Sequence, residues 1–272
     1  MSPAPTITNP AALETFRNSA RAYAFNPDSL WVGGYVTYEW AHARHVFESR
    51  QVPLAGARVL EFGCNLGATS IVLAALGAQV TGVDVNPQLV ELARANAACY
   101  DTPGRAEFIH VADTTALPFD DQAFDLISCN SVLEYVPHPL LHSVQKEIDR
   151  TLKIGGLIFI TGTSNRLWPY EVHSRKWLTN YLPRALDAVL FGGKEIKRGI
   201  FPWEVLRDFG AYENLDWHDG GRAFLESRRR MGVSGYKLTL LALANRMLHP
   251  AGLTAGLMTP SFSMTLCKRE LP

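Results

Sequence analysis

Five short β-branched segments alternate with longer helix-like segments between residues 57 and 162, and this alternation limits the fold more than any other feature. It is typical of a parallel sheet whose crossover connections are helices. The predicted strands are Arg58 to Phe62, Gln79 to Val83, Ala106 to His110, Phe124 to Cys129 and Leu157 to Thr161. The predicted helices are Leu66 to Leu76, Pro87 to Cys99 and Pro139 to Leu152. Ligands of such sheets bind beyond the carboxyl ends of the strands, so the residues that follow each strand are the candidates for a site.

Two less regular regions flank this α/β core. Residues 1–50 contain an aromatic-rich helical segment that we interpret as an N-terminal cover, and residues 51–272 form the main domain. Within that domain, 57–165 is the predicted ligand-binding core and 200–258 a helical insertion that also covers the site. The segment "SFSMTLCKR" alternates apolar and polar residues, which predicts a half-buried final strand. We expect the two covers to be mobile over an apolar pocket, with plain core helices as the alternative.

Charge and cysteine usage exclude several classes of partner. Lys plus Arg and Asp plus Glu both total 26, so no global basic field attracts nucleic acid. The four cysteines are far apart and suit a reducing, cytoplasmic compartment. The N-terminal residues do not resemble a signal peptide, and charged residues and a proline interrupt the longest apolar region. We therefore predict a cytoplasmic protein without a transmembrane segment; peripheral membrane contact and the oligomeric state are left open.

The turn in "VLEFGCNLGATS" excludes the commonest nucleotide ligands. Its spacing is Gly63-x-x-x-Gly67, not the G-x-G-x-x-G of dinucleotide sites, and Glu61 lies beside it. At ~4 Å and an effective dielectric constant near 20, a carboxylate next to a phosphate costs on the order of 4 kcal/mol. The turn also lacks the Lys-Ser/Thr pair of a P-loop. An NAD-dependent oxidoreductase is therefore disfavoured.

A nucleoside with a cationic end removes this conflict. S-adenosyl-L-methionine carries a sulfonium and an ammonium and no phosphate, so Glu61 becomes favourable. Asp84 ends the second strand, where an acid in nucleotide-binding folds accepts from both ribose hydroxyls. After the third strand, Asp113 is placed to accept from the adenine amino group and the Thr114 amide to donate to a ring nitrogen. After the fourth, Asn130 and Ser131 border the methionine end of the ligand.

The segments "VLEFGCNLG", "VTGVDVN", "VADTTALPFDDQAFDLISCNSVLEYV" and "EIDRTLKIGGLIFIT" together resemble the ordered motifs of class I S-adenosylmethionine-dependent methyltransferases. The chain is similar more narrowly to the group with the ubiquinone and menaquinone biosynthesis methyltransferases, over roughly residues 57–165. The resemblance implies a Rossmann-like seven-stranded mixed sheet whose last strand is antiparallel, with helices on both faces. Cys64 and Asn65 stand where many relatives carry Gly or Ser. The implied cofactor-binding residues are Glu61, Gly63, Gly67, Asp84, Val85 (packed on adenine), Asp113, Thr114 and Asn130.

The residues that would act on an acceptor are less strongly indicated. His173 follows the fifth strand in a stiff, aromatic segment, and its ordinary pKa near ~6.5 suits a general base. Glu171 or Arg175 is expected to tune it, while a plain loop histidine is the alternative. Glu134 and Tyr135 are interpreted as capping and packing residues of the following helix. The pairs His42/His45 and His138/His142 have spacings that permit a shared metal but lack a third ligand, so no metal site is predicted.

These features predict methyl transfer from S-adenosyl-L-methionine to a small-molecule acceptor. O-methylation of an apolar or aromatic metabolite is favoured, because such a transfer needs mainly positioning and the exclusion of water. N- or C-methylation and a non-catalytic module that only binds the cofactor are the alternatives.

Overall fold

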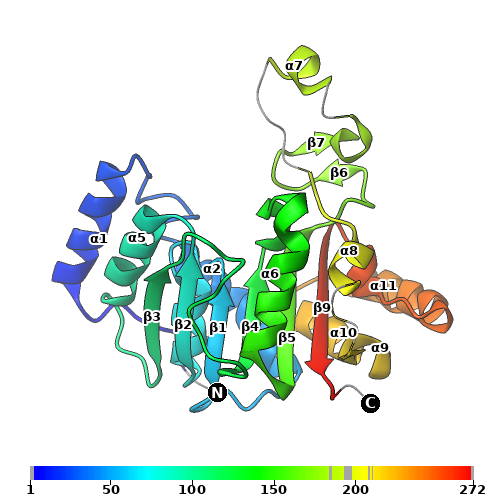
Figure 1. Cartoon of the computed structure of the whole chain (residues 1–272), viewed down its shortest axis with the longest axis horizontal. Coiled ribbons are helices and arrows are strands. Elements are labelled where there is room, and N and C mark those ends of the chain that lie inside the picture. Colours follow the sequence, from blue (N-terminus) through cyan, green and yellow to red (C-terminus); the bar gives the residue numbers. More distant parts are fainter. Residues whose placement is uncertain (1–2, 184–185, 193–197, 208, 210, 271–272) are drawn as a thin grey trace.

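The computed structural model describes residues 3–183, 186–192, 198–207, 209 and 211–270. Its main element is a seven-stranded sheet with the order β3-β2-β1-β4-β5-β9-β8 (Figure 1). β1 to β5 are parallel, and β9 runs antiparallel to both of its neighbours, β5 and β8. The strands are β1 (Arg58–Phe62), β2 (Gln79–Asp84), β3 (Arg105–His110), β4 (Phe124–Asn130), β5 (Leu152–Ser164), β8 (Tyr212–Asn214) and β9 (Ser261–Lys268). The predicted mixed α/β sheet with an antiparallel last strand is confirmed.

Helices cover both faces of this sheet and extend past β9, on the side of the edge strand β8 (Figure 1). The N-terminal part forms α1 (Pro10–Ala22), α2 (Tyr35–Ala41) and α3 (Ala43–Ser49), and the core contains α4 (Ala68–Ala75), α5 (Pro87–Ala97) and α6 (His138–Thr151). A short hairpin of β6 (Tyr170–Glu171) and β7 (Lys176–Trp177) follows β5. The later helices are α7 (Asp187–Leu190), α8 (Pro202–Leu206), α9 (Leu215–His218), α10 (Arg222–Arg230) and α11 (Gly235–Leu248).

Two hydrophobic cores hold the helices on the sheet. On one face, α6 buries Leu141, Val144 and Ile148, spaced three to four residues apart, against β4, β5 and β9. On the other face, Phe47 of α3 packs on Phe159 of β5 with ring centroids 4.8 Å apart. Because both faces are covered, the central strands β1 and β4 are almost continuously buried, as expected for a parallel sheet.

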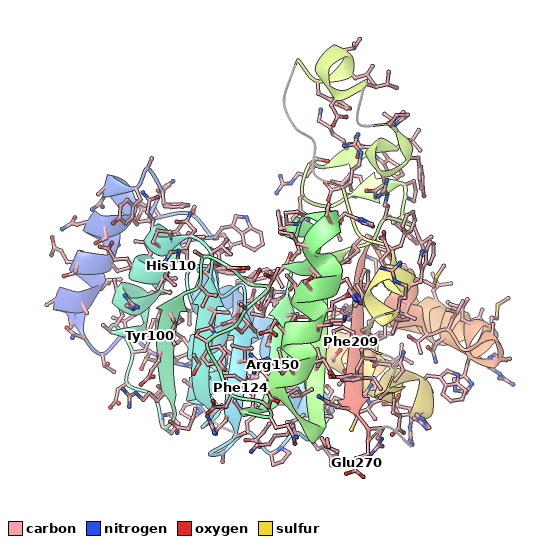
Figure 2. The ribbon with its side chains drawn as sticks, viewed as in Figure 1. Tyr100, His110, Phe124, Arg150, Phe209 and Glu270 are labelled. Carbon is pink, nitrogen blue, oxygen red and sulfur yellow. The ribbon has the colours of Figure 1, made fainter. Side chains whose placement is uncertain are left out.

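The parallel strands all end at the same edge of the sheet. Figure 2 shows His110, at the end of β3, near that edge, and Phe124, at the start of β4, near the opposite one. At the carboxyl end of β2, the Asn86 side chain accepts a hydrogen bond from the Gln88 amide, and Pro87 begins α5. This local capping explains why the chain turns sharply directly after Asp84.

The structure corrects two details of the predicted elements. β5 begins at Leu152, which was predicted as the last residue of the preceding helix, and so starts five residues before the predicted Leu157. The final strand is buried on both faces, not half-buried: Ser263 and Thr265 are 8% and 4% exposed. α9 and its neighbours cover the second face, and the Thr265 amide donates to the Asp216 carboxylate over 2.6 Å. The polar residues of this strand therefore do not face solvent, although their alternation with apolar residues predicted that they would.

Residues 200–258 pack on the N-terminal helices. Arg50, just after α3, contacts the Asp216 carboxylate and donates to Asp219 Oδ2 over 2.7 Å. α11 lies mostly outside the body of the molecule, at the β9 side (Figure 1). Within the described ranges, no helix combines the length and apolar character needed to cross a membrane.

Candidate active site

A cavity of about 740 Å³ lies beyond the carboxyl ends of β1, β2, β4 and β5. Its volume is within the range of small-molecule sites. Part of its wall is backbone and side chains that directly follow the strands. The rest comes from Trp31 and α2, from α4 and α5, from residues 132–137, from Val172 and His173, and from Ser261. The cavity thus joins the predicted strand-end site to segments that lie far away in the sequence.

The glycine turn forms one wall of this cavity. Gly63 has φ +75°, Asn65 φ +50° and Gly67 φ +74°, so the turn uses the left-handed region three times within five residues. Asparagine tolerates that region better than most residues, which explains how the chain departs from the usual small residue at 65. A Cβ on Gly67 would lie 2.7 Å from the Phe108 ring. Gly67 itself begins α4 and does not line the cavity.

Asp84 is held by backbone amides on both sides. Its Oδ2 accepts from the Asn65 amide over 3.0 Å and its Oδ1 from the Asn86 amide over 2.9 Å. The carboxylate is therefore oriented before any ligand arrives, with further lone pairs available for hydroxyl donors. Val85 beside it lines the cavity and is 56% exposed, as an apolar surface for a flat ring would be.

The two residues after β3 are placed differently. Thr114 lines the cavity. The Asp113 side chain does not, because its Oδ1 accepts from the Thr115 amide over 2.9 Å and from the Thr115 hydroxyl over 2.6 Å. These hydrogen bonds lower the pKa of Asp113. The structure thus brings seven of the predicted residues to the cavity: Glu61, Gly63, Asp84, Val85, Thr114, Asn130 and His173.

Glu61 lies at the bottom of the cavity and is only 2% exposed. Burial raises its pKa to about 8, although hydrogen bonds from Ser70 and Thr69 favour the charged form. The Ser70 hydroxyl donates to Glu61 Oε2. Glu61 is therefore tied to the first turn of α4 by neighbouring hydroxyls.

Glu39 is a second carboxyl in the same cavity, and sequence reasoning missed it. It comes from α2, is 5% exposed and lines the cavity with Tyr35. Burial raises its pKa to about 7, while hydrogen bonds with Asn130 and Tyr35 oppose that rise. The signal in the sequence was its position: Val36, Glu39 and Trp40 share the buried face of α2. An acid on the apolar face of a helix is a stronger indication of function than an acid on a polar face.

Asn130 and Ser131 end β4 at the centre of the cavity wall. Asn130 Nδ2 donates to Thr69 Oγ1 over 3.1 Å, and Asn130 Oδ1 accepts from Thr161 Oγ1 over 3.1 Å. Ser131 has φ +54°, which turns the chain away from the strand. The hydrogen bonds fix the amide of Asn130 between α4 and β5, close to both carboxyl groups.

His173 lies at the opposite wall, between acidic and hydroxyl groups. Its Nδ1 is 3.1 Å from Glu171 Oε1, and its Nε2 is 3.1 Å from Ser131 Oγ and 3.7 Å from Glu134 Oε1. The His173 side chain is 25% exposed, and the ring of Tyr135 lies 5.3 Å from it, edge to face. Of the two residues expected to tune His173, Glu171 contacts it, while Arg175 is exposed.

The two neighbouring carboxyl groups differ in charge state. Burial opposes ionisation of Glu171, but hydrogen bonds from His173 and Ser174 prevail and lower its pKa to about 2. Burial raises the pKa of Glu134, whose Oε1 accepts from the Ser131 hydroxyl and the Ser164 amide. Glu134 therefore connects the ends of β4 and β5. It does not cap α6, which has no side-chain cap, so the capping interpretation was wrong.

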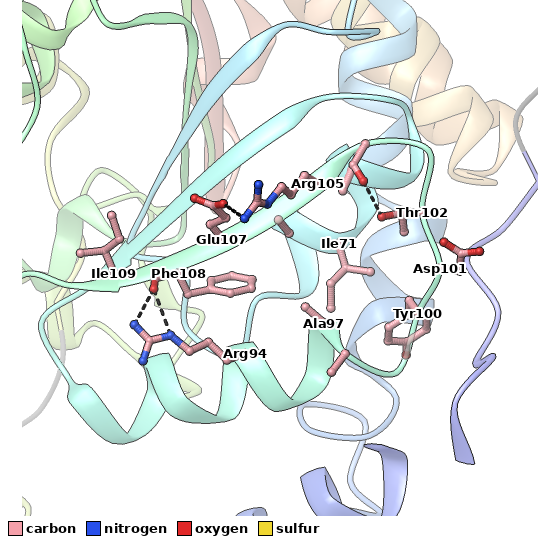
Figure 3. A pocket seen from close by; sticks show the side chains of 14 residues that line it. Ile71, Arg94, Ala97, Tyr100, Asp101, Thr102, Arg105, Glu107, Phe108 and Ile109 are labelled. Carbon is pink, nitrogen blue, oxygen red and sulfur yellow. Dashed lines mark hydrogen bonds and ion pairs between the residues drawn. The ribbon is translucent and has the colours of Figure 1, made fainter. Parts of the chain in front are cut away.

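A second cavity, of about 590 Å³, lies at the β3 edge of the sheet, away from the strand ends (Figure 3). There, Arg94 Nη2 donates to the Phe108 carbonyl over 2.7 Å and covers part of that edge strand. The Arg105–Glu107 ion pair borders the same cavity. None of the predicted site residues lines it, so it does not share the chemistry of the first cavity. In the described part of the chain, no three His, Cys, Asp or Glu side chains are grouped as metal ligands would be.

Comparison with known proteins gives one family and several relatives. A methyltransferase domain family matches residues 60–160. The ubiquinone biosynthesis O-methyltransferase of Xanthomonas oryzae pv. oryzae (strain PXO99A) is 35% identical over 141 residues, 51% of this chain and 57% of the relative. The enzyme of the same name from Glaesserella parasuis serovar 5 is 31% identical over 178 residues, 61% of this chain and 70% of the relative. The match thus spans little more than half the length of the Xanthomonas relative.

Among solved structures, a SAM-dependent methyltransferase from Methanosarcina mazei superposes with a TM-score of 0.46. It is 23% identical, and the superposition covers 58% of this chain and 81% of that one.

Proposed function

The chain belongs to the class I S-adenosylmethionine-dependent methyltransferases, and on this basis we propose that it methylates an oxygen of a small, apolar or aromatic molecule. The observation that carries the proposal is the charge of the cavity. Glu39, Glu61 and Asp84 line it, and in the part of the chain that the structure describes no Lys or Arg does. A cationic nucleoside would favour the charged forms of these acids, whereas a pyrophosphate would oppose them.

The residues present fit S-adenosyl-L-methionine along the whole strand edge. Asp84 would accept from the ribose hydroxyls, Val85 would pack on the adenine, and Thr114 would face its polar edge. Gly63 and Gly67 keep the turn narrow, and Asn130 with Glu61 borders the amino acid end. When bound, the cofactor supplies a methyl group that its sulfonium already activates. The roles of Gly67 and Asp113 would be indirect, through the turn and the Thr114 loop.

The acceptor would lie between the aromatic residues of the N-terminal segment and the wall around His173. Trp31, Tyr35, Tyr38 and Tyr135 all line the cavity, and Tyr135 lies beside His173. Glu171, ionised at neutral pH, accepts the Nδ1 proton of His173, so Nε2 carries a lone pair. The Ser131 hydroxyl has one proton and can donate it to this lone pair only by turning away from Glu134. His173 Nε2 would take the proton of an acceptor hydroxyl as that oxygen is methylated.

The relatives support an oxygen as the methylated atom, because two of them are named as O-methyltransferases of ubiquinone biosynthesis. The buried, free cysteines Cys64, Cys99, Cys129 and Cys267 are in keeping with the cytoplasmic location that we include in this proposal. We also propose that residues 1–50 act as a cover, since α2 contributes directly to the cavity wall. Residues 200–258 contribute none of the described lining and pack on α3 instead.

Two experiments test the proposal. Calorimetry should detect binding of S-adenosylhomocysteine and not of NAD; the reverse result would contradict the assignment of the ligand. Methyl transfer from labelled cofactor into a fractionated metabolite extract, followed by mass spectrometry, should then give a labelled O-methyl product. A labelled N- or C-methyl product would change the acceptor atom, and binding without any transfer would indicate a non-catalytic module.

A further inference from the structure

The two buried carboxyl groups of the cavity, those of Glu61 and Glu39, have different neighbours. Glu61 Oε2 accepts from the Ser70 hydroxyl, and Thr69 is a second hydrogen-bonding neighbour of this carboxyl group from α4. Glu61 therefore already has partners that come from its own α/β core. Glu39 is fixed from outside that core, by α2, and its neighbours are Tyr35 and the amide of Asn130.

The position of Glu39 along the cavity follows from Asn130. Asn130 is the last residue of β4, and β4 lies directly beside β1, which ends at the glycine turn. Asp84, at the end of β2, lies one strand further away on the other side of β1. The carboxyl group of Glu39 therefore lies near the centre of the cavity wall, on the other side of β1 from the proposed ribose and adenine positions.

At this place the ionised form of a buried carboxyl group would need a cationic partner to be stable. Ionising it without one is costly, because the charged form of Glu61 nearby repels it and burial removes its hydration. The lining contains no Lys or Arg in its described part that would supply the opposite charge. The partner must then come with a ligand. An ammonium group would both pair with Glu39 and satisfy its oxygens through charge-assisted hydrogen bonds.

We propose that Glu39 binds the ammonium group of the cofactor's amino acid portion, so that the N-terminal helix α2 completes the cofactor site. This inference rests on the proposed function. Tyr35 positions Glu39 by hydrogen bonding, and Asn130 holds it from the side of the sheet. Glu61 acts as the structural acid of the turn and contributes field, not a direct contact with the ammonium.

The test compares two nucleosides that differ in the amino acid part. S-adenosylhomocysteine carries the ammonium, and 5′-methylthioadenosine keeps the adenine, ribose and sulfur but lacks it. Isothermal titration calorimetry with Glu39→Gln should show S-adenosylhomocysteine binding weakened at least about tenfold, with methylthioadenosine affinity changed by less than about twofold. Glu14→Gln, an exposed acid of α1 in the same N-terminal region, is the matched control and should leave both affinities unchanged.

A second variant keeps the test valid if Glu39→Gln folds poorly. Tyr35→Phe retains the ring and removes only the hydroxyl that hydrogen-bonds to Glu39, so it should weaken S-adenosylhomocysteine selectively and by less. Equal affinity of Glu39→Gln and the parent for S-adenosylhomocysteine would overturn the proposal. An equal loss for both nucleosides would also overturn it, since Glu39 would then act only through the fold. If the parent binds neither nucleoside, the proposed function itself fails.

Discussion

The two ends of the main cavity are built in different ways. At the Asp84 end, backbone groups position the functional side chain: two amides within twenty residues hold its carboxylate. At the His173 end, side chains do so, and Ser131 and Glu134 come from about forty residues earlier in the chain. The difference teaches that the first end is encoded in a short local pattern, while the second depends on the whole tertiary structure. Substitutions should therefore act differently at the two ends.

The largest effect is expected in the glycine turn, where no side chain can compensate. Gly67→Ala places a Cβ 2.7 Å from the Phe108 ring at a φ of +74°. We expect the free energy of unfolding to fall by ~2 to 5 kcal/mol and cofactor binding to be lost. Urea unfolding measures the first and calorimetry the second.

Gly155→Ala is the matched control for the turn. Gly155 has φ +78°, and a Cβ there meets nothing within 4 Å, so only the backbone cost of ~1 kcal/mol remains. Equal destabilisation by the two alanines would mean that close packing in the turn is unimportant.

The next effect concerns Asp84. Asp84→Ala removes the acceptor that two ribose hydroxyls would share, at ~1 to 3 kcal/mol for each group left unpaired, so S-adenosylhomocysteine affinity should fall about 100-fold or more. Asp113→Ala should cost less than about tenfold, because the Asp113 side chain is turned toward Thr115. Calorimetry on both variants checks the order. Unchanged affinity of Asp84→Ala would remove the ribose assignment.

At the other end, His173→Gln should separate binding from turnover. We expect turnover to fall ~100-fold, because general-base catalysis is lost, with S-adenosylhomocysteine affinity unchanged. Steady-state kinetics across pH and calorimetry provide the two readouts. Unchanged turnover at every pH would exclude His173 as the base and direct attention to Glu134 and Tyr135. His138 is a weaker choice, since it is exposed and pairs with Glu204 outside the cavity.

The smallest effect is the pH dependence of the unliganded protein's stability. Burial raises the pKa of Glu39 to about 7 and that of Glu61 to about 8, above their ordinary 4.5. Between the ordinary pKa of 4.5 and the raised values, the folded state thus binds more protons than the unfolded state. The free energy of unfolding therefore falls as pH rises from about 5 to 8. Glu39→Gln should reduce this loss of unfolding free energy between pH 5.5 and 8.5 by ~1 to 3 kcal/mol. Urea unfolding at pH 5.5 and 8.5 measures it, and parallel slopes in variant and parent would contradict the raised pKa of Glu39.

Sequence patterns predicted the core of this fold well because each strand and turn is encoded by residues that are close together in the sequence. β1 was predicted to the residue, and β2, β3 and β4 to within one residue at each end. The same holds for the turn: glycine spacing and the acid after β2 are readable without any tertiary knowledge. Their assignment to the cofactor stays a prediction.

What could not be predicted depends on long-range packing. Glu39 was not among the predicted residues, because only the packing of α2 against α4 brings it to the cavity. The Asp113 side chain is turned away from the cavity by its hydrogen bond with the Thr115 hydroxyl. The spacing of residues in the sequence does not reveal this local hydrogen bond. β9 is buried on both faces because α9 and α10 pack on its second face. The alternation of residues within the strand does not predict these helices.

The wall of the main cavity takes residues from Trp31 to Ser261, nearly the full length of the chain. During synthesis Glu39 leaves the ribosome long before His173. The carboxyl group of Glu39 can therefore take its place in the cavity only after the later segments have been made. Contacts so distant in sequence form late, because the intervening chain must first be ordered. A ligand of this cavity holds the two extremes of the chain together, and at 100 times its Kd it adds about 2.7 kcal/mol to the stability of the whole protein. Occupancy of the cavity would thus report whether a newly made chain has finished folding.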